Sequence, residues 1–220
     1  MLDMARAARK LDRSLSKTLE IAGHSQGGHA ALWAASLAPS WTPEEKLRAT
    51  VAFAPASHLE EQGRILPSLN SSLGNLGAFA GLVVRAVDVQ HPDQGIGSLL
   101  SDKAAALYPH TLDLCLGELG KPDSFGGLKG NEFFKSDANL DPFFADVAAG
   151  DPEGLTIKTP VLVEQGAADT TVLPPFTEQL VKEYKGRGNP VTYKTYKGVS
   201  HGGIVVSAAK DSTAFLKKRR

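Results

Sequence analysis

The stretch GHSQGG at residues 23–28 constrains the fold of this 220-residue chain more than any other. The apolar segment Thr18–Gly23 predicts a short strand that runs directly into it, and the alanine-rich segment after it predicts a helix that ends at Pro39. The backbone must therefore turn sharply at Ser25, where flanking side chains would collide with the strand and the helix. Glycine two residues before and two residues after Ser25 removes both collisions. The pattern predicts a serine held on a tight turn at the carboxyl end of a strand.

Strands and helices continue to alternate through most of the chain. An apolar strand around Ala49–Ala56 is followed by a long stretch of helices and loops, 58–159, and then by the order strand, helix, strand, helix. This order predicts an α/β protein with an open, mostly parallel sheet flanked by helices. The residues before the first strand predict an amphipathic helix. Its apolar residues at helical spacing are Met1, Met4, Ala5, Ala8 and Leu11, and the remaining patterns predict helices at 76–87, 102–119, 174–186 and 204–218 and strands at 159–166 and 189–198.

Two polar residues follow the later strands of the predicted sheet. Asp169 comes directly after the third strand, and His201 comes directly after the fourth. The carboxyl ends of parallel strands share one edge of a sheet, so Ser25, Asp169 and His201 are expected to converge in that chain order. A serine hydroxyl is a weak nucleophile until a histidine accepts its proton and a carboxylate orients that histidine. The three residues are therefore the predicted catalytic triad. Asp169 could instead cap a turn, and Glu164 is the alternative acid.

Composition argues against several other kinds of site. Lys and Arg together number 24, as do Asp and Glu, so the chain has no net charge to attract nucleic acid or an anionic membrane. The single cysteine, Cys115, cannot form an intrachain disulfide, and its apolar neighbours predict that it is buried. No residue spacing suggests a metal site or a phosphate-binding loop, so no metal or cofactor is expected. The N-terminus lacks the apolar core of a signal peptide, and no segment is long and apolar enough to span a bilayer.

Taken together, the motifs resemble those of the secretory lipase family in the α/β-hydrolase superfamily. The resemblance is carried by ARAARKLD before the first strand, by GHSQGGHAALWAA and LAPSW around the serine, and by FAPASHL after the second strand. LDLCLGEL, VLVEQGAADTTVLP and YKGVSHGG extend it through the rest of the chain. It implies an esterase or lipase of lipid metabolism that hydrolyses short- to medium-chain acyl esters through an acyl-serine intermediate, without a cofactor.

By position, the resemblance implies that Ser25 is the nucleophile, Asp169 the acid and His201 the base. It also implies that the backbone N–H of Gln26 is one donor to the oxyanion. The core would comprise residues 1–58 and 159–220, and residues 59–158 would form a helical cap inserted between the second and third strands. The phenylalanines of the cap are either walls of an acyl pocket or plain core: Phe133, Phe134, Phe143 and Phe144.

The chain departs from the family at its start. Family members carry a whole N-terminal half before the nucleophile strand, with a loop that supplies a second oxyanion donor; loss of one such donor typically costs about 10²–10³ in turnover. Without that half the strand Thr18–Ala22 has an open edge, which we expect a second copy of the chain, in a homodimer, or a substituting segment to cover. The chain is expected to be either a fragment of a longer secreted enzyme or a short variant that stays in the cytoplasm.

Two other functions fit the same residues. A serine peptidase or an acyltransferase could use the same triad, because the leaving group is selected by the cleft rather than by the triad. A catalytically impaired fragment could keep the fold as a binding module. The complete triad argues against that module, whereas the missing oxyanion loop argues for it. The expected partner is a small-molecule ester, with no nucleic acid and no stable insertion into a membrane.

Overall fold

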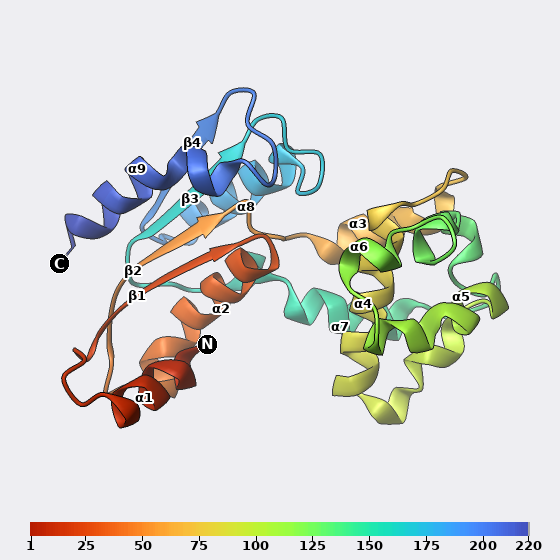
Figure 1. The fold of residues 1–220 in the computed structure, drawn as a ribbon, viewed down its shortest axis with the longest axis horizontal. Helices are drawn as coiled ribbons and strands as arrows, with labels where there is room; N and C mark the ends of the chain where they lie inside the picture. The colour runs from red at the N-terminus through yellow and green to blue at the C-terminus, as the bar shows by residue number, and fades with distance from the viewer. Residues whose placement is uncertain (220) are drawn as a thin grey trace. The chain divides into compact units, whose positions relative to one another are not determined.

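The computed structural model describes residues 1–219, and their contacts divide the chain into two compact units (Figure 1). One unit combines Met1–His58 with Asp151–Arg220, and Leu59–Gly150 forms the other. The residues just before 159, assigned above to the inserted segment, lie in the first unit. The reason is hydrophobic burial, because the side chains of Leu155 and Ile157 are part of the first unit's core.

A parallel four-stranded sheet forms the centre of the first unit (Figure 1). β1 (Thr18–His24), β2 (Lys46–Phe53), β3 (Val161–Gly166) and β4 (Val191–Tyr196) lie in that order, each paired in parallel with the next. All six residues of β3 are buried, as expected of a strand covered on both faces. The predicted open parallel sheet is confirmed.

Helices cover both faces of this sheet. α2 (Gln26–Trp41) and α8 (Pro174–Gly186) pack against one face, and α9 (Ile204–Lys217) packs against the other (Figure 1). Successive side chains of a strand point to opposite faces, so Leu162 of β3 joins the core under α9 while its neighbours join the core under α8. The sheet therefore separates two small hydrophobic cores.

The N-terminal helix, α1 (Leu2–Leu11), does not bury the apolar stripe that its sequence predicts. Leu2 is the buried residue of the helix and packs in a cluster with Ile21 of β1. Met4 and Leu11, by contrast, are 70% and 91% exposed. Helical spacing identified a helix correctly but not the side of it that packs.

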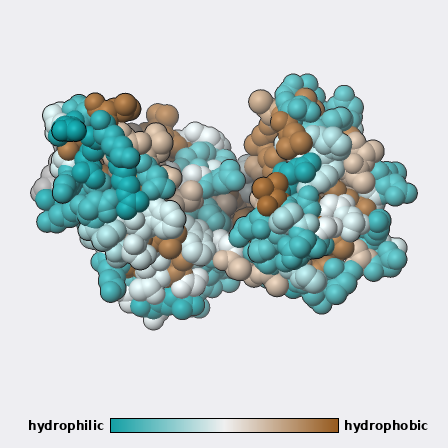
Figure 2. Space-filling model, turned by 90° about the horizontal axis from the view of Figure 1, so that it is seen from below, coloured by the Kyte–Doolittle hydropathy of each residue, from teal (hydrophilic) through white to brown (hydrophobic). Residues whose placement is uncertain are grey.

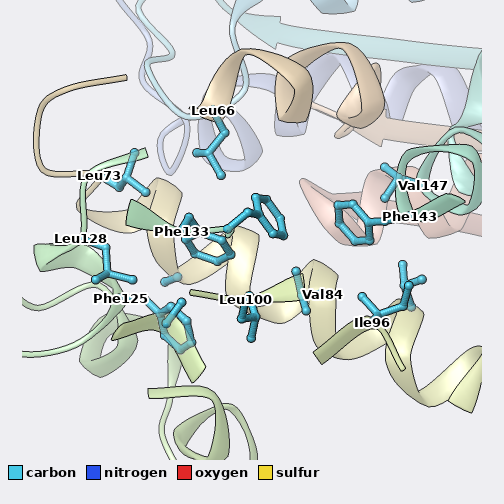
Figure 3. Packing of buried hydrophobic residues seen from close by; sticks show 14 of the residues in the cluster. Leu66, Leu73, Val84, Ile96, Leu100, Phe125, Leu128, Phe133, Phe143 and Val147 are labelled. Atoms are coloured by element: carbon cyan, nitrogen blue, oxygen red, sulfur yellow. The ribbon is translucent and has the colours of Figure 1, made fainter. Parts of the chain in front are cut away.

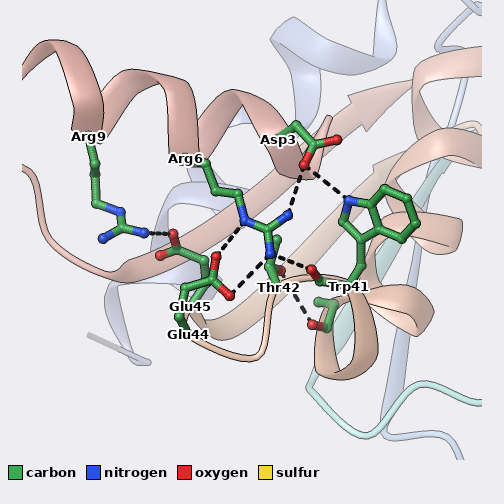
Figure 4. Close-up of polar contacts among 8 residues, drawn as sticks. Asp3, Arg6, Arg9, Trp41, Thr42, Glu44 and Glu45 are labelled. Atoms are coloured by element: carbon green, nitrogen blue, oxygen red, sulfur yellow. Dashed lines mark hydrogen bonds and ion pairs between the residues drawn. The ribbon is translucent and has the colours of Figure 1, made fainter.

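Polar contacts fix α1 to the loop after α2 (Figure 4). Arg6 donates hydrogen bonds to Asp3 at 3.0 Å and to the backbone carbonyl of Trp41 at 2.6 Å, and it forms an ion pair with Glu44. The hydrogen bond from Arg6 lowers the pKa of Glu44 to about 2. These polar contacts hold α1 in place although most of its apolar stripe faces solvent.

α2 continues to Trp41, although the sequence predicts that it ends at Pro39. A proline in a helix removes one N–H and therefore one hydrogen bond. Here the loss falls in the last turn, which is still closed by a bond of 3.0 Å from Thr42 N to the carbonyl of Ala38. A proline this close to the end costs the helix little structure.

The second unit consists of helices and short turns around a core of its own. Figure 3 shows this core, in which the ring of Phe133 lies 5.7 Å from that of Phe125 and 5.0 Å from that of Phe134, between centroids. Phe143 and Phe144 are buried in the same cluster. Its α-helices are α3 (Leu59–Ile65), α4 (Asn75–Gln90), α5 (Asp102–Leu107), α6 (Leu116–Leu119) and α7 (Asp141–Gly150).

The segment 102–119, predicted as one helix, folds as three short pieces. α5 gives way at Tyr108 to a 3₁₀ helix with Pro109 in its first turn, and α6 begins only at Leu116. Proline lacks the N–H that a continuous helix would use there. Cys115, predicted to be buried, precedes α6 and is exposed.

The surface carries some exposed apolar side chains, and short 3₁₀ helices connect the longer elements. Within residues 1–219, no helix is both long and apolar enough to cross a membrane. Apolar side chains nevertheless reach the surface in small patches among hydrophilic ones (Figure 2). The 3₁₀ helices are η1 (Leu66–Ser68), η2 (Pro92–Gln94), η3 (Ile96–Leu99), η4 (Tyr108–Leu112), η5 (Phe125–Gly127), η6 (Gly130–Glu132) and η7 (Pro152–Gly154).

Candidate active site

Ser25 occupies the turn between β1 and α2 in a strained backbone conformation. Its φ is 58° and its ψ −122°, which residues other than glycine rarely adopt and which costs about 1–3 kcal/mol. Hydrogen bonds hold it there: Ser25 N donates to the carbonyl of Phe53 at 2.9 Å, and its carbonyl accepts from His29 N at 3.1 Å. Ser25 is partly exposed to solvent.

Two glycines make this turn possible, and one of them is not the glycine that the sequence predicts. A Cβ on Gly23 would lie 1.9 Å from the carbonyl oxygen of Gly27, so the expected collision before the serine is confirmed. A Cβ on Gly27 would meet nothing within 4 Å. The crowded position after the serine is Gly28, whose Cβ would lie 3.0 Å from Cα of Pro55. The prediction for Gly27 is therefore wrong, because the helix presses its next residue against the chain that follows β2.

His201 and Asp169 form a direct hydrogen bond. His201 Nδ1 lies 2.8 Å from Oδ2 of Asp169, which is 3% exposed. An ionised carboxylate only accepts hydrogen bonds, so Nδ1 carries the proton and Nε2 is left as the basic nitrogen. Thr171 N and Val172 N donate to the other oxygen, Oδ1, at 2.8 and 2.9 Å. These bonds fix the carboxylate and, through it, the tautomer of the imidazole.

The structure adds a residue that sequence reasoning missed. Gln165, the fully buried neighbour of Glu164 in β3, donates from Nε2 to Oδ2 of Asp169 at 3.1 Å. Its own Oε1 accepts from the hydroxyl of Thr177 at 2.8 Å. A glutamine inside an apolar strand was the available signal, since a buried amide must find hydrogen-bond partners.

Glu164, the alternative acid, faces away from His201. It is fully buried and accepts a hydrogen bond of 2.7 Å from the hydroxyl of Tyr196 in β4. Burial raises the pKa of Glu164 above its ordinary value. Because adjacent residues of a strand point to opposite faces, Glu164 and Gln165 cannot both serve the same histidine.

His24 links the serine turn to the histidine loop. Its Nε2 lies 3.0 Å from the carbonyl oxygen of His201, and the centroids of the two rings are 4.5 Å apart. Ser25 follows His24 directly, so contacts along the chain bring Ser25, His201 and Asp169 into one neighbourhood. A hydrogen bond from the Ser25 hydroxyl to His201 is not among those formed within residues 1–219. Such bonds are often long in the absence of substrate and tighten when it binds.

Gln26 is placed where an oxyanion donor is needed. It is the first residue of α2, directly after Ser25. The first N–H groups of a helix have no acceptor within it, and they carry the positive end of the helix dipole. The backbone N–H of Gln26 can therefore donate to a negative oxygen. No three His, Cys, Asp or Glu side chains among the described residues are grouped to hold a metal ion.

Comparison with known proteins relates these features to one family. The model of the secretory lipase family matches residues 1–107, which contain the serine turn. A comparison with curated proteins finds no match.

Solved structures of similar fold come from several organisms. Lipase A of Candida antarctica is 20% identical with a TM-score of 0.69, covering 91% of this chain and 48% of that one. The rice cell wall degrading esterase LipA of Xanthomonas oryzae is 23% identical with a TM-score of 0.72, covering 98% of this chain and 63% of that one. A Legionella pneumophila protein is 15% identical with a TM-score of 0.75, covering 99% and 61%.

Likeness at these identities shows the fold, and the chain spans from about half to under two thirds of each of these structures. The family match and the fold agree with each other and with the motifs of the sequence. Residues 1–107 thus match the model of the secretory lipase family, and the chain shares the fold of these lipase and esterase structures.

Proposed function

We propose that this protein is a serine carboxylic-ester hydrolase with Ser25 as nucleophile, His201 as base and Asp169 as the orienting acid. The observation that carries the proposal is the 2.8 Å hydrogen bond between His201 Nδ1 and buried Asp169, next to a serine on a strained strand-to-helix turn. The family match and the lipase and esterase folds support the same reaction class.

The proposed reaction follows from the protonation states at this site. His201 Nε2 accepts the hydroxyl proton as Ser25 Oγ attacks the ester carbonyl, and Asp169 stabilises the imidazolium that forms. The N–H of Gln26 donates to the oxyanion. The imidazolium then protonates the leaving alcohol, which leaves an acyl-serine. Water attacks that ester with His201 again as base, releasing the acid and restoring Ser25.

The inserted unit, Leu59–Gly150, is proposed to be the cap that selects the acyl group. The unit is inserted in the chain between β2 and β3, where the family that the sequence resembles carries its cap, and this supports the role. The phenylalanines of the unit are buried in its own core, which favours their reading as core rather than as pocket walls. The resemblance to the family supports short- to medium-chain acyl esters as the substrates. The family's description as secretory supports a location outside the cell.

Hydrolysis of p-nitrophenyl butyrate and labelling by a fluorophosphonate test the proposal. The wild-type chain should turn over the ester and lose activity as Ser25 is labelled, whereas Ser25→Ala should do neither. Ser40→Ala is the matched control, because Ser40 is an exposed serine of α2, the helix that follows Ser25. Equal rates for wild type and Ser25→Ala would contradict the proposal and favour a binding module.

Peptidase and acyltransferase activities are the alternative reactions of the same three residues. Amide substrates and added alcohol acceptors distinguish them in the same assay. Faster cleavage of a peptide p-nitroanilide than of the ester would favour a peptidase. Ester product formed with an added alcohol, in place of free acid, would favour an acyltransferase.

A homodimer through β1 is part of the proposal. Among the described strands β1 pairs with β2 alone, so one of its edges has no strand beside it. Unpaired strand edges tend to pair with other chains, and a second copy can supply such a strand. Analytical ultracentrifugation should find a dimer at micromolar concentration, and a purely monomeric chain would contradict this part of the proposal.

A further inference from the structure

His24 makes two contacts with His201 that the triad chemistry does not require. At the end of β1, its Nε2 lies 3.0 Å from the backbone carbonyl oxygen of His201. A carbonyl can only accept, so Nε2 carries a proton and donates. The two imidazole rings also lie 4.5 Å apart between centroids, at an interplanar angle of 40°.

We propose that His24 is a positioning residue for His201. Its Nε2–H fixes the backbone of the loop that carries His201, and its uncharged ring does not oppose the imidazolium that forms when His201 accepts the Ser25 proton. This inference rests on the proposed roles of Ser25 and His201.

Position along the chain explains why this contact matters for geometry. His24 is bonded directly to Ser25, whose backbone is held at φ 58° by its own hydrogen bonds. The loop of His201 is also held by the side-chain bond to Asp169 and by a backbone bond of 3.0 Å from Ala168 N to the carbonyl of Val199. The bond from His24 therefore ties the base to the nucleophile's own strand, and errors of about 1 Å between reacting groups can cost about 10²-fold in rate.

Burial and a neighbouring charge favour the neutral form of His24. Burial is the largest cause that lowers its pKa, and the neighbouring charge of His201 lowers it further. Its bond to the His201 carbonyl and the carboxylate of Asp169 act in the opposite direction. His201 and Asp169 are the titratable groups that face it. A neutral His24 does not oppose the imidazolium of His201, whereas a protonated His24 would repel it.

The other histidine beside the serine does not share this arrangement. His29 Nδ1 lies 3.2 Å from the carbonyl oxygen of Ala56, in the segment after β2. This contact therefore fixes a different loop. The motif GHSQGGH thus carries two histidines that hold two separate segments against the serine turn.

Two variants separate the hydrogen bond from the ring. His24→Phe keeps an aromatic ring but has no donor and no charge, whereas His24→Gln keeps an N–H donor without the ring. We expect kcat for p-nitrophenyl butyrate to fall about tenfold in His24→Phe with KM unchanged, since one hydrogen bond that fixes the base is lost. His24→Gln should lose less. His110→Gln, an exposed histidine of the second unit, is the control.

The pH profile distinguishes positioning from a merely structural role. In wild type, protonation of His24 adds to the loss of kcat/KM on the acid side, because it opposes formation of the imidazolium. In both His24 variants that loss should be less steep below about pH 6.5, the ordinary histidine pKa, because the pKa of His24 is lowered. NMR of the imidazole nitrogens of wild type should show His24 neutral and protonated at Nε2 at neutral pH.

The outcomes are distinguishable. If fluorophosphonate fails to label Ser25 in wild type, the proposed function is wrong, and NMR still decides whether the His24 contact exists. If Ser25 is labelled equally fast in wild type and both variants, with identical pH profiles, the inference is overturned. Melting temperatures within a few degrees of wild type show that a variant has folded. If neither variant folds, NMR of wild type decides. A His24 that is charged, or protonated at Nδ1, would overturn the inference.

Discussion

At the scale of single residues, hydrogen bonds hold both carboxylate oxygens of Asp169 in place. It accepts hydrogen bonds from His201, Gln165 and two backbone N–H groups, and it is almost completely buried. A buried carboxylate is stabilised only when such donors surround it. The same donors prevent rotation of the carboxylate, so the proton of His201 stays on Nδ1.

Replacing this acid tests its role. Asp169→Asn should lower kcat for the ester by about 10³–10⁴-fold with little change in KM, because an amide can present an N–H that stabilises the wrong tautomer of His201. Asp93→Asn, at an exposed aspartate, should match wild type. A loss of less than tenfold in Asp169→Asn would show that another group orients the base.

Glu164 gives a second prediction, on stability. Its Oε1 lies 2.7 Å from the Tyr196 hydroxyl, which is also 2.8 Å from Asp211, so one phenol proton faces two carboxyl groups. Burial raises the pKa of Glu164, which favours its neutral form in the fold. A raised folded pKa stabilises the fold fully below the ordinary glutamate pKa, and this contribution is lost as pH rises through the raised value.

The free energy of unfolding of wild type should therefore fall as pH rises across that window, by at most about 1.4 kcal/mol per pH unit. Glu164→Gln is neutral at every pH and should lack this slope. Urea denaturation at several pH values measures it, with exposed Glu178→Gln as the control. Identical slopes in wild type and Glu164→Gln would show that Glu164 is ionised in the fold.

At the scale of elements, the strand-to-helix turn depends on backbone contacts rather than on side-chain packing. Gly23 faces the carbonyl of Gly27 and Gly28 faces Pro55, so β1, α2 and the segment after β2 approach within backbone contact. Only residues without a Cβ permit that approach. The serine conformation follows from this crowding and from the hydrogen bond to Phe53.

Two neighbouring glycine substitutions should have opposite effects. Gly23→Ala puts a methyl group 1.9 Å from a carbonyl oxygen and should destabilise the fold by about 3 kcal/mol or more. Gly27→Ala has open space, and alanine is the better helix former, so stability should rise by about 0.5–1 kcal/mol. Melting temperatures compare the two, and a loss of equal size in both would contradict the assigned geometry.

At the scale of the whole molecule, each of the two units contains a hydrophobic cluster. Leu59–Gly150 packs around its phenylalanines, whereas the cores of the first unit lie on the two faces of the sheet. The clusters share no residues. A defect in one core should therefore stay within its unit, since local stability follows local packing.

Phe133→Ala tests this independence. Removing a fully buried ring should cost the second unit about 3–5 kcal/mol. Hydrogen exchange followed by mass spectrometry should show faster exchange across 59–150, with β3 and α9 of the first unit close to wild type. Leu112→Ala, at an exposed leucine, is the control. Equal acceleration in both units would show a single cooperative fold.

The sequence by itself determined the elements and their order. Alternation of apolar segments, glycine at the turn and the order of strands and helices follow from local chemistry, so the parallel sheet, the serine turn and the positions of Asp169 and His201 at strand ends were predictable. Those features depend on spacing along the chain. Local chemistry also explains the errors at Pro39 and in 102–119, where proline acts differently near a helix end and in a helix interior.

Only the tertiary structure decided which groups meet. Gln165 contacts Asp169, Gly28 rather than Gly27 is crowded, Leu2 rather than Met4 is buried, and His24 reaches the carbonyl of His201. The Gln165–Asp169 contact depends on the path of the loop after β3, and the others join segments far apart in the sequence or depend on the angle at which two elements pack. Periodicity gives the spacing of side chains along an element, whereas rotation about its axis is set by the surfaces it packs against.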